Sequence, residues 1–152
     1  MQKTLWKPGV GARSQSPVCI KFSVGRSRII DNRMERGVHM TQQTFMYEAK
    51  EQVLIIHLPK ELDHHNCRDL KYETDLLLAE NYITKVVFDF SRTDFMDSSG
   101  IGILLNRYKQ MVRSGGKVTL YGVNAQVGRV LAISGINRLM EHFDTKEAAV
   151  AG

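Results

Sequence analysis

The sequence predicts one α/β domain with a mainly parallel sheet of four to five strands and helices packed on it. Short apolar runs of strand length alternate with longer segments in which apolar residues recur at helical spacing. The run at residues 86–88 is apolar without a break, as expected for a strand that is covered on both faces. The chain has 152 residues, of which 43% are apolar, and this is enough for one domain with its own core.

The first half of the domain is expected to begin with a hairpin. Residues 45–51 and 53–58 read as two strands that are close enough in sequence to pair antiparallel. A helix follows, because Asp63 is a good N-cap, and it ends near residues 80–81. Its buried face is predicted from the spacing of Cys67, Leu70, Thr74, Leu77 and Leu78.

The central stretch is predicted to be a strand, a short polar loop and a second helix. The strand covers residues 84–90, and the loop covers residues 91–96. Asp97 caps the helix, and residues 114–116 (Ser-Gly-Gly) end it. The apolar face of this helix is predicted to be Ile101, Leu104, Leu105, Tyr108, Met111 and Val112.

The C-terminal part continues the alternation. Residues 117–123 read as a strand, and Asn124 caps a third helix that stops at Gly135. A short strand at residues 139–143 and a terminal helix at residues 145–151 complete the domain.

The positive charge of the chain lies almost entirely in its first 39 residues. Residues 1–39 hold eight Lys or Arg against two acidic residues, whereas residues 40–152 hold 13 basic and 14 acidic residues. We therefore expect a disordered or non-native basic extension over residues 1–39, with Met40 as a possible start, and a domain over residues 40–152. A basic arm for nucleic acid is the disfavoured alternative.

The remaining composition indicates a cytoplasmic protein. The chain has no apolar run long enough to span a membrane and no apolar segment typical of a secretory signal. The two cysteines form neither a disulfide framework nor a metal-binding spacing.

Enzyme motifs are incomplete throughout the sequence. The glycines at positions 100 and 102 lack the third glycine of a dinucleotide loop. Ser98 lacks the glycine that a hydrolase nucleophile elbow has two residues earlier, so a serine hydrolase stays only as an alternative. His64 and His65, next to each other at a helix start, point in different directions and do not predict a metal site. His57, inside a strand, is expected to be hydrogen-bonded or to face an edge.

Two adjacent hydroxyls, Ser98 and Ser99, remain at the start of the second helix. No neighbouring base is evident in the sequence, so these side chains are better suited to accept a phosphoryl group than to act as nucleophiles. A phosphate adds a charge of about −1.5 to −2, which a helix N-terminus tolerates. Because Asp94 and Asp97 already make this surface acidic, the added charge would act on a docked partner.

The loop that carries these serines resembles the STAS-domain anti-sigma factor antagonists. The resemblance rests on residues 95–102 (Phe-Met-Asp-Ser-Ser-Gly-Ile-Gly) and residues 107–110 (Arg-Tyr-Lys-Gln). Residues 61–65 (Glu-Leu-Asp-His-His), the glycine pair at 115–116 and residues 134–135 support the same match. It covers the chain from Thr44 to Phe143 and implies a STAS fold.

The resemblance implies a partner-switching regulator of sporulation transcription that is not an enzyme. The unphosphorylated antagonist binds an anti-sigma factor that is also a serine kinase, and the sigma factor is released. The kinase phosphorylates the first serine of the loop, which is Ser98 here, and a serine phosphatase reverses the step. ATP and Mg²⁺ belong to the kinase, so no cofactor of the chain itself is expected. The partner-binding residues of this reading are Asp63, Asp97, Ser99, Gly100, Glu61 and Asp94.

One departure from the family's pattern affects the loop before Glu61. Lys60 stands after Pro59, where the family usually has glycine. A STAS regulator of a stress-response circuit is the second reading that the resemblance leaves open.

Overall fold

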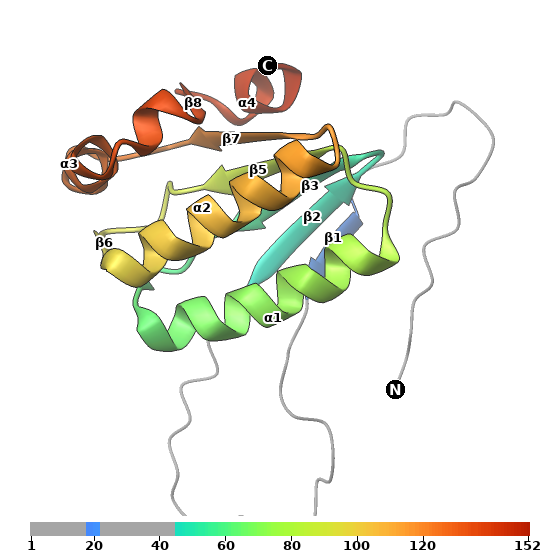
Figure 1. Ribbon diagram of the computed structural model, residues 1–152, viewed down its shortest axis with the longest axis horizontal. Coiled ribbons are helices and arrows are strands. Elements are labelled where there is room, and N and C mark those ends of the chain that lie inside the picture. The colour runs from blue at the N-terminus through green and yellow to red at the C-terminus, as the bar shows by residue number, and fades with distance from the viewer. Residues whose placement is uncertain (1–17, 22–44) are drawn as a thin grey trace, which may run out of the picture.

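The structure is a computed structural model that describes residues 18–21 and 45–152 (Figure 1). In chain order its elements are β1 (Val18–Lys21), β2 (Met46–Lys50), β3 (Val53–His57), β4 (Glu61–Leu62), α1 (His64–Glu80), β5 (Lys85–Asp89), β6 (Phe95–Met96), α2 (Ser98–Arg113), β7 (Lys117–Tyr121), α3 (Ala125–Ser134), the 3-10 helix η1 (Ile136–Arg138), β8 (Glu141–Phe143) and α4 (Lys146–Ala151).

The main sheet confirms the predicted α/β class. Its strand order is β1-β2-β3-β5-β7-β8, with β1, β2 and β3 antiparallel and the pairs from β3 to β8 parallel. The hairpin of β2 and β3 is therefore confirmed. Strand β1 comes from the segment expected to be a basic extension, and the rest of residues 1–39 lies outside the described residues.

The helices cover the sheet in two layers. Figure 1 shows α1 and α2 side by side across one face of the sheet. Alternating side chains of β3 and β5, such as Ile56 and Phe88, pack into the core under these helices, while Ile55 and Val87 join Ala149 of α4 on the other face. Full burial of a side chain such as Phe88 contributes roughly 1.5–3 kcal/mol to the free energy of folding.

The predicted helix caps are confirmed. The side chains of Asp63, Asp97 and Asn124 each accept a backbone N–H from the first turn of α1, α2 and α3. Such a cap is worth about 1 kcal/mol of stability. Gly135 ends α3 in the left-handed conformation with φ of 77°, which glycine adopts without a steric penalty.

The predicted buried face of α2 was partly wrong. Val112 is 50% exposed, whereas Ile103 and Arg107 are buried. Each helical residue is rotated by about 100° from the previous one, so Val112, which follows the buried Met111, points away from the core. The buried positions are Gly100, Ile103, Leu104, Arg107 and Met111.

Candidate functional site

Two neighbouring loops at the carboxyl edge of the sheet form the site. One loop follows β3 and the other follows β5, and these two strands are parallel neighbours. The loops are joined by the short parallel pair of β4 and β6, which the sequence did not predict because two-residue strands have no periodicity. The backbone N–H groups of Asp94 and Phe95 donate to the carbonyl of Lys60 at 2.8 and 3.2 Å, and that of Asp97 donates to Leu62 at 3.2 Å.

This pairing brings the predicted residues of both loops into one surface. We call the surface the serine face and define it by Glu61, Asp63, Asp94, Phe95, Asp97 and Ser98. Glu61, Asp94, Phe95 and Ser98 are exposed, and Asp63 and Asp97 are half-buried. The predicted candidates, which lie more than 30 positions apart in the sequence, are thus neighbours in space.

Ser98 is the first residue of α2 and is exposed, while Ser99 is half-buried. The Ser99 backbone N–H donates to Asp97 Oδ1 at 2.7 Å, which fixes the first turn of the helix. The Ser99 hydroxyl also lies 3.4 Å from Nδ1 of His64 at the start of α1. This distance exceeds the roughly 2.6–3.2 Å at which a base activates a nucleophile, and it involves Ser99 rather than Ser98.

Asp63 plays the matching role at the start of α1. Its Oδ1 accepts the backbone N–H of Asn66 at 2.9 Å, and the Asn66 side chain donates to the carbonyl of Glu61 at 2.7 Å. The helix therefore fixes the loop that precedes it. The two helix N-termini, each capped by an aspartate, lie together at the serine face.

Gly100 lies beneath the serine face rather than on it. A Cβ atom at this position would be 2.3 Å from Cγ of Met96 and 3.1 Å from Cδ2 of Leu62. Both neighbours are buried residues of the β4–β6 pair. The structure thus gives Gly100 a packing role, since only glycine lets α2 approach these strands so closely.

The charges around Ser98 are mainly acidic. Burial, and then the carboxylates of Asp97 and Asp63, raise the pKa of the nearby Cys67 thiol to about 12. Lys60 forms an exposed ion pair with Asp94, with 3.7 Å between Nζ and Oδ2. Exposed pairs of this kind contribute about 0–1 kcal/mol, so Lys60 offsets the charge of one carboxylate without fixing the loop.

Phe95 is a residue that sequence reasoning missed. The Phe95–Met96 pair reads as loop packing, and Met96 is indeed buried, but the Phe95 side chain is 47% exposed among the acidic residues. The two residues lie on a strand, where neighbouring side chains point to opposite faces, so only one of them can pack inward. An exposed aromatic side chain at the centre of a polar surface is typical of a protein–protein contact.

Within residues 18–21 and 45–152, no group of three or more His, Cys, Asp or Glu side chains is placed to hold a metal ion. The helices of this described part are each too short or too polar to cross a bilayer.

Comparison with known proteins shows which sequences and structures this chain is similar to. Residues 44–149 match the model of the STAS domain. The chain is 35% identical over 98 residues to the anti-sigma F factor antagonist of Paenibacillus polymyxa, an alignment that covers 64% of this chain and 84% of the relative.

Two solved structures of SpoIIAA are also similar. The unphosphorylated anti-sigma factor antagonist SpoIIAA matches with a TM-score of 0.64 and 29% identity over 70% of this chain and 92% of that one. The phosphorylated form of the Bacillus protein matches with a TM-score of 0.59 and 28% identity over 70% of this chain and 96% of that one.

Proposed function

This chain belongs to the STAS domain family, and we propose that it is an anti-sigma factor antagonist whose serine face is switched by phosphorylation of Ser98. Its relatives of that name are regulatory binding proteins rather than enzymes, and the chain is a protein of the same kind. The observation that carries the proposal is the exposed hydroxyl of Ser98 at the start of α2, in the middle of an acidic surface.

The unphosphorylated serine face binds the anti-sigma factor. Phe95 offers apolar contact area, and the exposed carboxylates of Glu61 and Asp94 can accept hydrogen bonds from the partner. The anti-sigma factor is also the serine kinase that modifies the site. An anti-sigma factor that is bound to the serine face no longer holds its sigma factor.

A phosphate on Ser98 acts outward rather than on the fold. The positive end of the α2 dipole stabilises an anion by about 0.3–1 kcal/mol, so the helix tolerates the modification. A like-charge contact with a docked partner at about 4 Å costs on the order of 1–4 kcal/mol. Since about 1.4 kcal/mol is a tenfold change in affinity, a single such contact is enough to release the partner.

The circuit around the chain follows from this switch. ATP and Mg²⁺ are held by the kinase, and a serine phosphatase in the cytoplasm restores the active form. Two similarities favour sporulation as the process controlled, namely the anti-sigma F factor antagonist relative and the match to SpoIIAA in both phosphorylation states.

Phosphorylation mapping tests the proposal. The full chain is incubated with purified anti-sigma factor kinase from the same source, ATP and Mg²⁺, and the product is analysed by tandem mass spectrometry. We expect one phosphate, on Ser98, in the native chain and in a Ser99→Ala variant, and none in Ser98→Ala. Phosphate on Ser99 in the native chain, or an unmodified native chain, would refute the assignment.

A further inference from the structure

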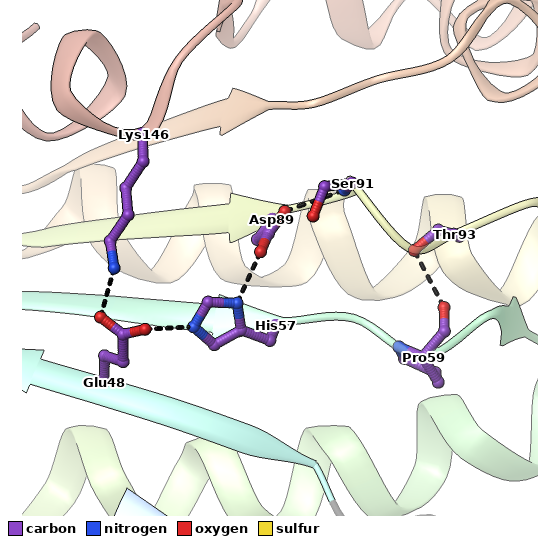
Figure 2. Close-up of polar contacts among 7 residues, drawn as sticks. All are labelled: Glu48, His57, Pro59, Asp89, Ser91, Thr93 and Lys146. Carbon is purple, nitrogen blue, oxygen red and sulfur yellow. Dashed lines mark hydrogen bonds and ion pairs between the residues drawn. The ribbon is translucent and has the colours of Figure 1, made fainter. Parts of the chain in front are cut away.

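Outside the serine face, side chains of β2, β3, β5 and α4 form a connected row of polar contacts. Figure 2 shows the His57 ring between two carboxylates. Nδ1 of the ring lies 2.5 Å from Oδ2 of Asp89, and Nε2 lies 2.8 Å from Oε1 of Glu48. Lys146 of α4 donates to the other oxygen of Glu48.

The sheet register explains this arrangement. His57 and Asp89 are the last residues of the parallel strands β3 and β5 and lie opposite each other. On the antiparallel side His57 lies opposite Met46, so Glu48, two residues along the same strand, projects to the same face as a diagonal neighbour. The two carboxylates therefore meet the ring from opposite sides.

This geometry requires a protonated ring. Only an imidazolium can donate from both nitrogens, whereas a neutral ring would turn one lone pair toward a carboxylate. The bond to Asp89, opposed by burial and assisted by Glu48, raises the pKa of His57 above its ordinary value. Although burial opposes it, hydrogen bonds from His57 and Ser91 hold the pKa of Asp89 well below its usual range.

The same pair begins a ladder of hydrogen bonds between the two loops, of which Figure 2 shows the contacts of Asp89 with Ser91 and of Thr93 with Pro59. The Leu58 N–H donates to the Asp89 carbonyl at 3.0 Å, and the Ser91 N–H donates to Asp89 Oδ1 at 2.8 Å. The Thr93 hydroxyl then donates to the Pro59 carbonyl at 2.9 Å. The next rung is the β4–β6 pair, which carries the serine face.

We propose that the His57 imidazolium, clamped between Glu48 and Asp89, is a positioning residue that holds the two loops of the serine face in register. The loss of its proton removes one rung at the base of the ladder and loosens the β4–β6 pair. That this positioning serves the serine switch rests on the function proposed for Ser98. The coupling between His57 and the two loops does not depend on that function.

Other charged groups surround the ring and are part of the same titration. On the far side of Asp89, Tyr121 of β7 has its pKa raised by burial and then by the Asp89 carboxylate. The groups bonded to His57 or to its two carboxylates are Glu48 of β2, Asp89 of β5, Tyr121 of β7 and Lys146 of α4. Glu147 of α4 acts on Tyr121, and Lys60 and Arg92 line the same cleft as His57.

A pH titration of the full chain by NMR tests the coupling without any partner. The reporters are the backbone amides of Asp94, Phe95 and Asp97, which donate across the two loops. We expect their shifts to change with the midpoint measured on the His57 ring, while the amides of Val118 and Thr119, near the start of β7, do not follow it. Reporter amides that do not titrate with His57 would overturn the inference.

A His57→Gln variant gives the second readout, because glutamine can donate to only one of the two carboxylates. His142→Gln is the matched control, since His142 lies in the edge strand β8 and not between the loops. At a pH below the His57 midpoint, we expect the reporter amides of His57→Gln to exchange with deuterium at least about tenfold faster than in the native chain, because local opening of the two loops becomes easier. The amides of Val118 and Thr119 in His57→Gln, and the reporter amides in His142→Gln, keep their native exchange rates.

The result separates a positioning role from general stabilisation. Unchanged protection of the reporter amides in His57→Gln, or an equal loss of protection at Val118 and Thr119, would overturn the inference. If His57→Gln does not fold, the pH titration of the native chain still decides whether His57 is coupled to the reporter amides. A chain that shows the coupling but is not phosphorylated on Ser98 would refute the proposed function alone, and the reverse outcome would refute this inference alone.

Discussion

Ser98 and Ser99 are adjacent, yet their side chains have different surroundings. Ser98 is exposed, whereas the backbone of Ser99 is bonded to Asp97 and its hydroxyl lies near His64. Consecutive helical residues point about 100° apart, so two neighbouring hydroxyls cannot present the same surface to a kinase. This difference is the structural basis for choosing Ser98 as the phosphate acceptor.

At the scale of single residues, Gly100 and Gly102 provide a testable prediction. Gly100→Ala would place a Cβ 2.3 Å from Cγ of Met96, whereas nothing lies within 4 Å of a Cβ at Gly102. We expect Gly100→Ala to lower the free energy of unfolding by about 1–3 kcal/mol through overpacking. Gly102→Ala, the matched control, should be neutral or raise it by up to about 1 kcal/mol, because alanine is the better helix former. Urea unfolding measures both, and equal effects would contradict the packing role of Gly100.

At the scale of elements, Arg107 joins the two helices that carry the site. Its buried guanidinium on α2 donates to Asp75 Oδ1 at 2.6 Å and to the Lys71 carbonyl at 2.7 Å, both on α1. It also donates to Gln110 of its own helix. Because α1 and α2 both start at the serine face, this contact fixes one N-terminus relative to the other.

Arg107→Ala is therefore expected to destabilise the domain. It removes both bonds to α1 and leaves a cavity, with an expected cost of about 3 kcal/mol in the free energy of unfolding. Lys71→Ala is the control, since its exposed ion pair with Asp75 contributes about 0.5 kcal/mol at most. Chemical denaturation followed by circular dichroism compares the two, and a cost for Arg107→Ala no larger than that of the control would argue against the clamp.

The elements themselves could largely be predicted from the sequence. Apolar runs and caps such as Asp63 and Asp97 are local signals, and the helices and main strands follow them. The β4–β6 pair and the burial of Arg107 could not be predicted, because they depend on which segments meet after folding. The exposure of Phe95 and the clamp around His57 depend in the same way on pairing across the sheet.

At the scale of the whole molecule, buried charges shape the dependence of stability on pH. Against the effect of burial, hydrogen bonds lower the pKa values of Glu48, Asp75 and Asp89 below their ordinary values of 4.5, 3.8 and 3.8. Their stabilisation is present above those ordinary values and is lost as the pH falls through the lowered ones. The bond to Asp89 raises the pKa of His57, so its contribution is complete below 6.5 and is lost as the pH rises through the folded value.

We therefore expect the free energy of unfolding to decline on both the acidic and the alkaline side. Glu73, whose pKa is raised by burial, contributes stability that is present below 4.5 and is lost as the pH rises through its folded value. His57→Gln should remove the part of the decline that begins above 6.5, and it should also reduce the acidic decline, because the bonds from His57 help to lower the pKa values of Asp89 and Glu48. Urea unfolding at a series of pH values measures this, and an unchanged alkaline decline in the variant would rule out His57 as its source.

The central claim is that one phosphate on Ser98 releases the partner while the fold is retained. The most direct measurement is calorimetric titration of the anti-sigma factor with the unphosphorylated chain and with the same chain phosphorylated on Ser98. We expect the affinity to fall by at least about tenfold, the equivalent of one like-charge contact, with an unchanged circular dichroism spectrum. Equal affinity of the two forms would contradict the account.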